Sequence, residues 1–184
     1  MQQVSLRQDI DCDDINTLTV DNPILIAKEL RKKFAPNDKY ISPQQLLKKI
    51  IKIYNIVIAP YEIQANVNAI SFKYDNMHII GVNCALTTKE LNFIIAHELG
   101  HILLSHNKTL SLNLKKEHCV SNKKFSAMDT QANAFAMELL LPAQVVAKIF
   151  LHLKNSDIYK YFNVCPKVVN YRLKELNLAS QDNQ

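Results

Sequence analysis

The sequence predicts an α+β domain that is mostly helical and carries a small antiparallel sheet. Long amphipathic segments with cap residues recur along the chain, whereas only three short runs have the composition of strands. The chain has 184 residues, of which 48% are hydrophobic, and this is enough for one core. It has two glycines and no glycine-rich phosphate loop, which argues against a nucleotide-binding fold.

Two helices are predicted in the N-terminal part of the chain, each after a cap residue and a proline. Asn22-Pro23 precedes the amphipathic run 24–34, and Ser42-Pro43 precedes a second run over 44–54. Proline suits the first helical position because its φ angle is already helical and its missing N–H has no intrahelical role there.

Three short strands are predicted between residues 56 and 82. The run 56–59 is rich in β-branched residues, and segments 69–74 and 77–82 flank Asp75-Asn76, a dipeptide that suits a tight hairpin turn. Strands joined by a hairpin pair in opposite directions, so these segments predict the small antiparallel sheet.

Helical patterns then follow over 87–105, 126–140 and 142–152, with two shorter ones over 156–162 and 167–176. The polar, basic stretch 106–125 between the first two is interpreted as a loop. The expected organisation is a polar N-terminal segment at 1–21, a main domain at 22–152, a helix-turn-helix-like appendage of the same domain at 153–178 and a tail at 179–184.

Composition also bears on location and partners. Residues 1–20 lack the basic and apolar regions of a signal peptide, and no apolar run reaches the roughly 18 residues of a membrane span. The four cysteines are scattered without a CxxC pair, which favours free, buried thiols in a reducing compartment. A net charge of +5 does not demand nucleic acid. We therefore expect a cytoplasmic protein with no membrane partner and no direct nucleic-acid binding.

The most informative segment runs from His97 to His106 and opens with His-Glu-x-x-His in an apolar, helix-compatible stretch. Side chains four residues apart share a helix face, so His97 and His101 can point two imidazoles at one cation. Glu98 lies about 100° further round the helix, within reach of a water on that cation. Two neutral nitrogen ligands, an open coordination position and an adjacent base are what a zinc peptidase needs.

A catalytic zinc site also needs a third protein ligand, and we favour Asp129. The helix face that begins at Asp129 continues through Ala132, Asn133 and Ala136, and these small residues allow close approach to the motif helix. The other downstream groups are His106, Glu117, His118, Cys119 and Glu138.

Those other groups fit the site less well. Glu138 lies about 180° round the helix from Asp129 and is interpreted as a surface charge. His106 points to the side opposite His97 and suits a surface position or one behind the ligands. His118 and Cys119 fall in the basic loop, which is a poor platform for metal ligands.

Two motifs therefore stand out, His97-Glu-Leu-Gly-His101 and the run from Asp129 through Gln-Ala-Asn-Ala-Phe-Ala-Met-Glu-Leu-Leu-Leu to Pro142. Together they resemble the ImmA/IrrE family of metallo-endopeptidases, and the resemblance covers roughly residues 22 to 178. It implies a zincin-like fold with an HExxH active-site helix. The family's second motif usually begins with glutamate as third ligand, whereas this chain has Asp129, which is one methylene shorter.

The resemblance implies a mechanism in which one Zn²⁺ per chain, held by His97, His101 and Asp129, polarises a water. Glu98 takes the proton of that water and delivers it to the leaving amine. Asn133 is expected to hydrogen-bond a ligand or a helix backbone behind the metal, and Gln131 to be exposed. Candidate donors to the oxyanion are His78, Tyr74 and His106.

By resemblance, the substrate is a helix-turn-helix transcriptional repressor in the regulation of a mobile element or a stress response. One alternative is a DNA-binding regulator that uses residues 156–174, with Lys167, Asn170, Arg172 and Lys174 facing DNA. Another is a partner-binding regulator with a silent peptidase site. The intact Glu98 argues against the latter, because ligation alone does not require a base.

Overall fold

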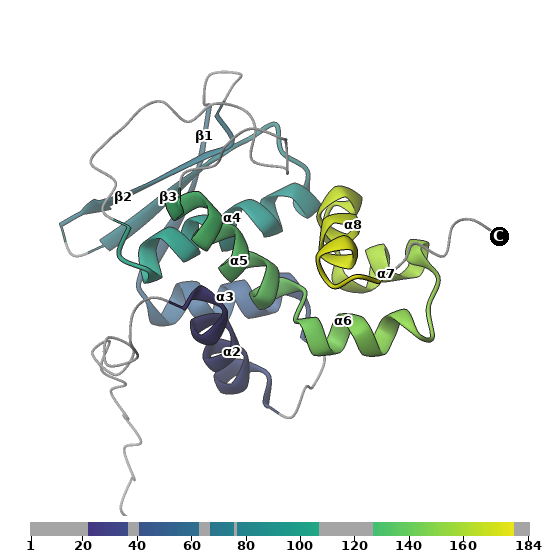
Figure 1. Ribbon diagram of the computed structural model, residues 1–184. Coiled ribbons are helices and arrows are strands. Elements are labelled where there is room, and N and C mark those ends of the chain that lie inside the picture. Colours follow the sequence, from purple (N-terminus) through teal and green to yellow (C-terminus); the bar gives the residue numbers. More distant parts are fainter. Residues whose placement is uncertain (1–21, 37–40, 63–66, 76, 107–126, 179–184) are drawn as a thin grey trace, which may run out of the picture.

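The fold is seen in a computed structural model that describes residues 22–36, 41–62, 67–75, 77–106 and 127–178 (Figure 1). The expected N-terminal segment at 1–21, most of the basic loop and the tail at 179–184 lie outside these ranges. The described elements are, in order, α2 (Pro23–Phe34), α3 (Pro43–Ile53), β1 (Ile56–Tyr61), β2 (Ala69–Tyr74), β3 (Met77–Asn83), α4 (Thr88–Leu103), α5 (Ala127–Leu140), α6 (Ala143–Phe150), α7 (Asn155–Phe162) and α8 (Pro166–Glu175). The α+β prediction is confirmed.

The helices begin where the cap residues predict. The Asn22 side chain accepts hydrogen bonds from the first turn of α2. Ser42 and Gln45 form a capping box at α3, and Thr87 and Glu90 form another at α4. Each cap provides acceptors for N–H groups that have no partner inside the helix, and so fixes where the helix starts.

The sheet has the order β1-β3-β2 and is mixed rather than wholly antiparallel. The predicted hairpin is present, since β2 and β3 are antiparallel with Tyr74 opposite Met77. The first strand, however, runs parallel to β3, with Ile56 opposite His78. The chain passes from β1 to the far edge of the sheet, and β3 returns between the two earlier strands. Hairpin signals describe neighbouring strands only, so they could not predict this crossover.

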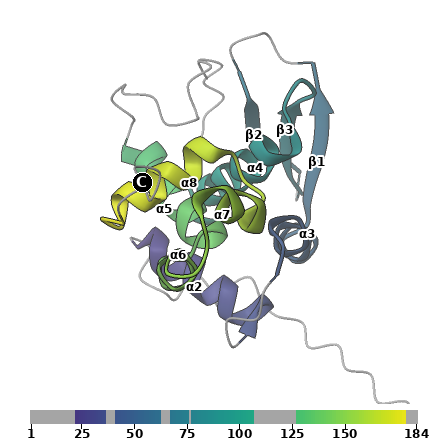
Figure 2. The same cartoon turned by 90° about the vertical axis from the view of Figure 1, so that its right-hand side faces the viewer.

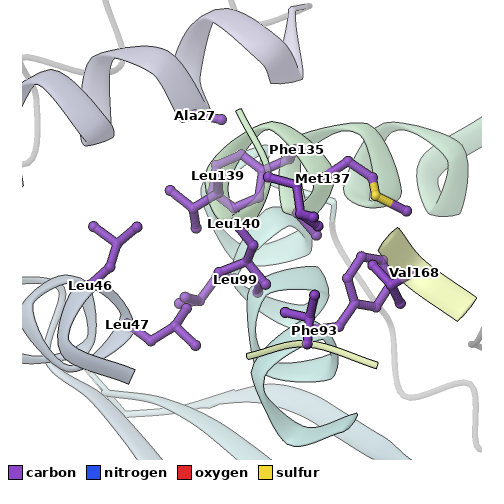
Figure 3. Packing of buried hydrophobic residues seen from close by; sticks show 14 of the residues in the cluster. Ala27, Leu46, Leu47, Phe93, Leu99, Phe135, Met137, Leu139, Leu140 and Val168 are labelled. Carbon is purple, nitrogen blue, oxygen red and sulfur yellow. The ribbon is translucent and has the colours of Figure 1, made fainter. Parts of the chain in front are cut away.

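Helix α4 lies at the centre of the fold (Figure 2). It packs against α5 on one side and against β2, β3 and α3 on the other, while α2 covers α5. Figure 3 shows Leu99 of α4 between Leu47 of α3 and the apolar side chains of α5, and Phe93 of α4 on the side of Val168 of α8. The motif helix is therefore held by buried contacts on several sides.

At Gly100, α4 and α5 lie too close together for a side chain to fit without a shift. A Cβ atom at this position would lie 3.1 Å from the Cα atom of Ala132 and 3.1 Å from Cδ1 of Phe135. These distances are shorter than ordinary carbon–carbon contacts, and the Ala132 atom belongs to the backbone. The small-residue face predicted for α5 is thus the face that contacts α4.

The C-terminal helix α8 is fastened to the core by a buried ion pair. Arg172 is 4% exposed and pairs with Glu138 of α5, which is 3% exposed, and its Nε also donates to the carbonyl oxygen of Leu141 at 3.0 Å. The expectation that Glu138 is a surface charge is wrong. Helical periodicity predicted that Glu138 faces away from Asp129. Periodicity carries no information on tertiary packing, so it could not predict that α8 covers that side of α5.

Two further expectations can be compared with the structure. Cys84 and Cys165 are free thiols, but Cys84 is exposed and Cys165 is half-buried, so neither is the buried thiol that we expected. In the described part of the chain, no single helix is long and apolar enough to cross a membrane. Helices α5 and α6 meet that length and composition only as a pair, with a 53° bend between them.

Candidate metal centre

His97 and His101 lie on one face of α4 with their rings side by side. Their Nε2 atoms are 3.0 Å apart, and the two residues are 3% and 2% exposed. The four-residue spacing on a buried helix produces this arrangement, as the sequence predicted.

Asp129 reaches the same point from the first turn of α5. Its Oδ1 atom lies 3.3 Å from Nε2 of His101 and 3.8 Å from Nε2 of His97. The three donor atoms all lie within 4.8 Å of one another. Two ligands of a tetrahedral zinc ion, each at about 2.0–2.1 Å, lie roughly 3.3 Å apart, so the donor spacing suits zinc. Glu117, His118 and Cys119, the loop alternatives, lie outside the described residues.

The hydrogen bonds behind the two rings indicate which nitrogen atoms carry protons. Nδ1 of His97 lies 2.9 Å from the amide oxygen of Asn133, and Nδ1 of His101 lies 3.0 Å from Nδ1 of His106. An amide oxygen only accepts, so the neutral His97 ring carries its proton on Nδ1 and its lone pair on Nε2. Asn133 thus contacts the ring of His97, and its role behind a metal ligand stays a prediction.

His106 continues this pattern. Its Nε2 atom lies 3.0 Å from Oε1 of Gln131, again an acceptor, so a neutral His106 presents Nδ1 as an acceptor to His101. With these assignments, both the His97 and the His101 ring turn Nε2 toward Oδ1 of Asp129. Two ring nitrogens and a carboxylate oxygen that meet at one point form a donor set that a divalent cation can bind. Gln131, which we expected to be exposed, is half-buried here.

Glu98 is 4% exposed and is held by a contact that sequence reasoning missed. The Ser71 hydroxyl of β2 donates to Oε2 of Glu98 at 2.5 Å. Ser71 shares a face of β2 with buried Ala69, and Ile80 lies opposite it in β3. A hydroxyl on the inward face of a strand was the one available signal, but the sheet order was needed to place it beside α4.

His78 and Tyr74, two of the candidate oxyanion donors, lie on the hairpin. Tyr74 is 67% exposed. His78 lies opposite Lys73, on the sheet face that also carries Ser71. Burial and, to a smaller extent, the charge of Lys73 lower the pKa of His78 below its ordinary value of 6.5, which favours the neutral ring.

Comparison with known proteins gives this arrangement a context. The family profile described as the IrrE N-terminal-like domain, of the M78 peptidases, matches residues 55–174, more than half of the chain and both motifs. The chain belongs to this family. The M78 match begins just before β1 and ends within α8, so α2 and α3 precede it.

Two known proteins are similar in sequence to this chain. An "Uncharacterized immunity region protein 2" of Bacillus phage phi105 is 30% identical over 135 residues, which are 71% of this chain and 79% of that protein. "Metallopeptidase ImmA" of Bacillus subtilis (strain 168) is 31% identical over 111 residues, which are 59% of this chain and 62% of the relative. The chain thus carries a metallopeptidase-family domain with a group of side chains that can hold a metal ion.

Proposed function

We propose that the protein is a zinc-dependent endopeptidase in which His97, His101 and Asp129 bind the metal and Glu98 is the catalytic base. The observation that carries this proposal is the convergence of three buried or half-buried donor atoms, from His97, His101 and Asp129, on one point. Glu98 follows His97 directly in the chain and is itself buried. Nitrogen and carboxylate ligands together suit zinc.

The protein's own groups have separate tasks in this mechanism. Bound zinc would supply Lewis-acid activation of a water and charge stabilisation for the oxyanion. The Glu98 carboxylate accepts the proton of the attacking water and transfers it to the leaving amine. Ser71 keeps that carboxylate oriented through its hydrogen bond, and Asn133 keeps the His97 ring oriented from behind.

An extended peptide has a defined place to bind. Within the described residues, β2 is an edge strand, because the order of the sheet is β1-β3-β2. Ser71 links this strand to the catalytic base, so a substrate strand added along β2 would pass the metal centre. Hydrogen bonds to the strand backbone would provide binding, and neighbouring side chains such as Lys73 and His78 would provide selectivity.

For the substrate, we propose a helix-turn-helix transcriptional repressor that controls a mobile element or a stress response in the cytoplasm. The family resemblance supports this, and the names of the two relatives, a phage immunity-region protein and a metallopeptidase, fit a regulatory protease. Net charge of +5 is compatible with an acidic protein surface as the first encounter.

The alternative of a DNA-binding regulator loses two of its four proposed contacts. Arg172 is buried against Glu138, and Asn170 accepts a hydrogen bond of 2.7 Å from the Tyr159 hydroxyl. Lys167 and Lys174 remain exposed on α8. Helix α8 buries Val168, Val169 and Arg172 against the core. This burial favours a packing role for residues 153–178 over DNA binding.

Metal content tests the site itself. Protein purified without added metal should hold about one zinc per chain by elemental analysis, and both His97→Ala and Asp129→Ala should lose it. His152→Ala, at an exposed histidine beyond α6, is the matched control and should keep it. Zinc retained by Asp129→Ala would place the third ligand elsewhere, and a wild type that binds none after zinc addition would refute the peptidase.

Proteolysis tests the substrate. Repressors encoded beside the gene should be cleaved by the zinc-loaded wild type and left intact by Glu98→Gln, since a positioned general base contributes about 10²–10⁴-fold in rate. Glu98→Gln should still bind one zinc. Cleavage at wild-type rate by Glu98→Gln would remove the base from the mechanism. Binding of a repressor by the zinc-loaded wild type without any cleavage would instead favour the silent, partner-binding alternative.

A further inference from the structure

The C-terminal end of α4 folds back onto one of the metal ligands. The N–H of His106 donates to the carbonyl oxygen of His101 at 3.0 Å. The N–H of Ser105 donates to the carbonyl oxygen of Ile102 at 3.2 Å. These two bonds and a left-handed residue between them are the Schellman arrangement that ends many helices. The backbone of His106 is therefore anchored to the residue whose ring it touches.

The left-handed residue of this turn is Ser105, with φ of 52°. Glycine is the usual choice there because it has no Cβ to clash. A residue with a side chain in this region is uncommon and persists where the surrounding structure determines it strongly. The turn thus brings His106 back toward the two histidines of α4, and it requires an unfavourable left-handed backbone conformation at Ser105.

The His106 ring then bridges two helices. Its Nδ1 lies 3.0 Å from Nδ1 of His101 on α4, and its Nε2 lies 3.0 Å from Oε1 of Gln131 on α5. The ring planes of His101 and His106 meet at 67°, an edge-on contact rather than a stack. This geometry suits a hydrogen bond from His101 to His106 and a second one from His106 to Gln131.

We propose that His106 is a positioning residue of the metal centre, oriented by Gln131, that holds His101 with its proton on Nδ1 and its Nε2 lone pair toward the metal. Gln131 accepts from Nε2–H of His106, so Nδ1 of His106 is the acceptor for His101. His106 would thus hold His101 as Asn133 holds His97, through a contact with the Nδ1 atom of the ring. The inference rests on the proposed zinc site and extends it to side chains outside the ligand set.

Zinc affinity is the first test, measured by competition with a chromophoric chelator. His106→Leu keeps a side chain of moderate size but removes both hydrogen bonds, and its zinc dissociation constant should rise about 10- to 100-fold. His106→Asn retains a polar group near the position of Nδ1 and should recover most of that loss. Gln131→Leu should weaken binding in the same direction by less, since it removes only the outer bond. His152→Leu is the control and should bind as the wild type does.

The protonation pattern is the second test and does not depend on affinity. Nitrogen-15 NMR of the zinc-loaded wild type should show His101 protonated at Nδ1 and His106 protonated at Nε2. In Gln131→Leu, His106 should lose its preference for the Nε2–H form. That variant also keeps the proposal testable if His106→Leu fails to fold.

The outcomes separate the two proposals. Wild-type affinity in both His106→Leu and Gln131→Leu, or a His106 ring protonated at Nδ1 instead, would overturn the positioning role and leave the zinc site standing. A wild type without zinc affinity would overturn both. Weakened binding that His106→Asn restores, with the predicted protonation pattern, would support the role of His106.

Discussion

Helix α5 carries two buried polar clusters that differ in one respect. Near its N-terminus, Asp129 and Asn133 face the two histidines of α4, and near its C-terminus Glu138 faces Arg172 of α8. In the second cluster a carboxylate meets a guanidinium that also donates to Leu141 and to Glu175. In the first, the Nε2 atoms of two histidine rings face a carboxylate oxygen of Asp129.

The difference indicates a structural role for the second cluster and agrees with the metal site that we propose for the first. Charge at Glu138–Arg172 is balanced inside the chain, which is how a buried ion pair is tolerated in a core. The histidine cluster brings two ring nitrogens and a carboxylate oxygen to one point, an arrangement that suits the cation we propose there. Buried polarity alone would not distinguish the two regions, whereas the identity of the facing atoms does.

The largest effect is expected from breaking the structural cluster. Arg172→Met leaves the Glu138 carboxylate buried without its guanidinium and should lower the free energy of unfolding by about 3–5 kcal/mol, measured by urea denaturation. Zinc stoichiometry should be unchanged in the folded variant, because the metal ligands lie at the other end of α5. The double variant Glu138→Met/Arg172→Met should recover most of the stability. A double variant as unstable as the single one would show that the other contacts of Arg172 dominate.

The second-largest effect is expected when zinc is added to the cluster of His97, His101 and Asp129. With free zinc at about 100 times its dissociation constant, the free energy of unfolding should increase by about 2.7 kcal/mol, because only the folded state presents the three ligands together. Asp129→Asn keeps the size of the side chain and removes its charge, so it should lose most of this increment. Thermal denaturation with and without zinc measures it. An equal zinc effect in both proteins would exclude Asp129 as a ligand.

The helix contact beneath the metal centre should give an intermediate effect. Gly100→Ala places a Cβ against the Ala132 backbone and should lower the free energy of unfolding by about 1–3 kcal/mol while weakening zinc binding. Gly81→Ala is a control at the other glycine, where the nearest atom to an added Cβ is Cγ1 of the Ile70 side chain at 3.1 Å and the nearest backbone atom is 3.9 Å away. It should cost less stability and leave zinc affinity unchanged. Equal effects on zinc affinity would mean that the helix separation does not govern the site.

The smallest effect is expected at the exposed cap of α4, where solvent can replace lost partners. Thr87→Ala should lower the free energy of unfolding by about 1 kcal/mol, measured by urea denaturation.

The same cap predicts a pH dependence of stability. Hydrogen bonds from the Thr87 side chain and backbone hold the pKa of Glu90 below its ordinary value of 4.5. The Glu90 contribution is therefore present above that value and is lost as pH falls through the lower, folded pKa. Urea denaturation should show the difference between wild type and Glu90→Gln shrinking below pH 4.5.

The contrast between these regions also explains what the sequence could predict. Caps at Asn22, Ser42 and Thr87 were predictable because their chemistry involves residues within one turn of the helix start. The common helix face of His97 and His101 was predictable for the same reason, because the two residues lie one helical turn apart. Asp129 followed from one helix face and the requirement for a third ligand.

Contacts between elements distant in sequence were not predictable. Ser71 reaches Glu98 only because β3 enters between the two earlier strands and leaves β2 beside the site. Glu138 is buried only because α8 returns to cover α5. Periodicity states which way a side chain points on its own element, but it contains no information about what packs there.

The absence of a side chain at Gly100 also constrains how this protein can evolve. The short Asp129 side chain reaches the histidines because α4 and α5 touch at the glycine, so residue sizes at positions 100 and 129 are linked. Exchanging aspartate for the longer glutamate at this helix separation would drive the carboxylate too far, and enlarging the glycine alone would leave it short. The two positions should therefore show epistasis, with Gly100→Ala tolerated better in an Asp129→Glu background than in the wild type.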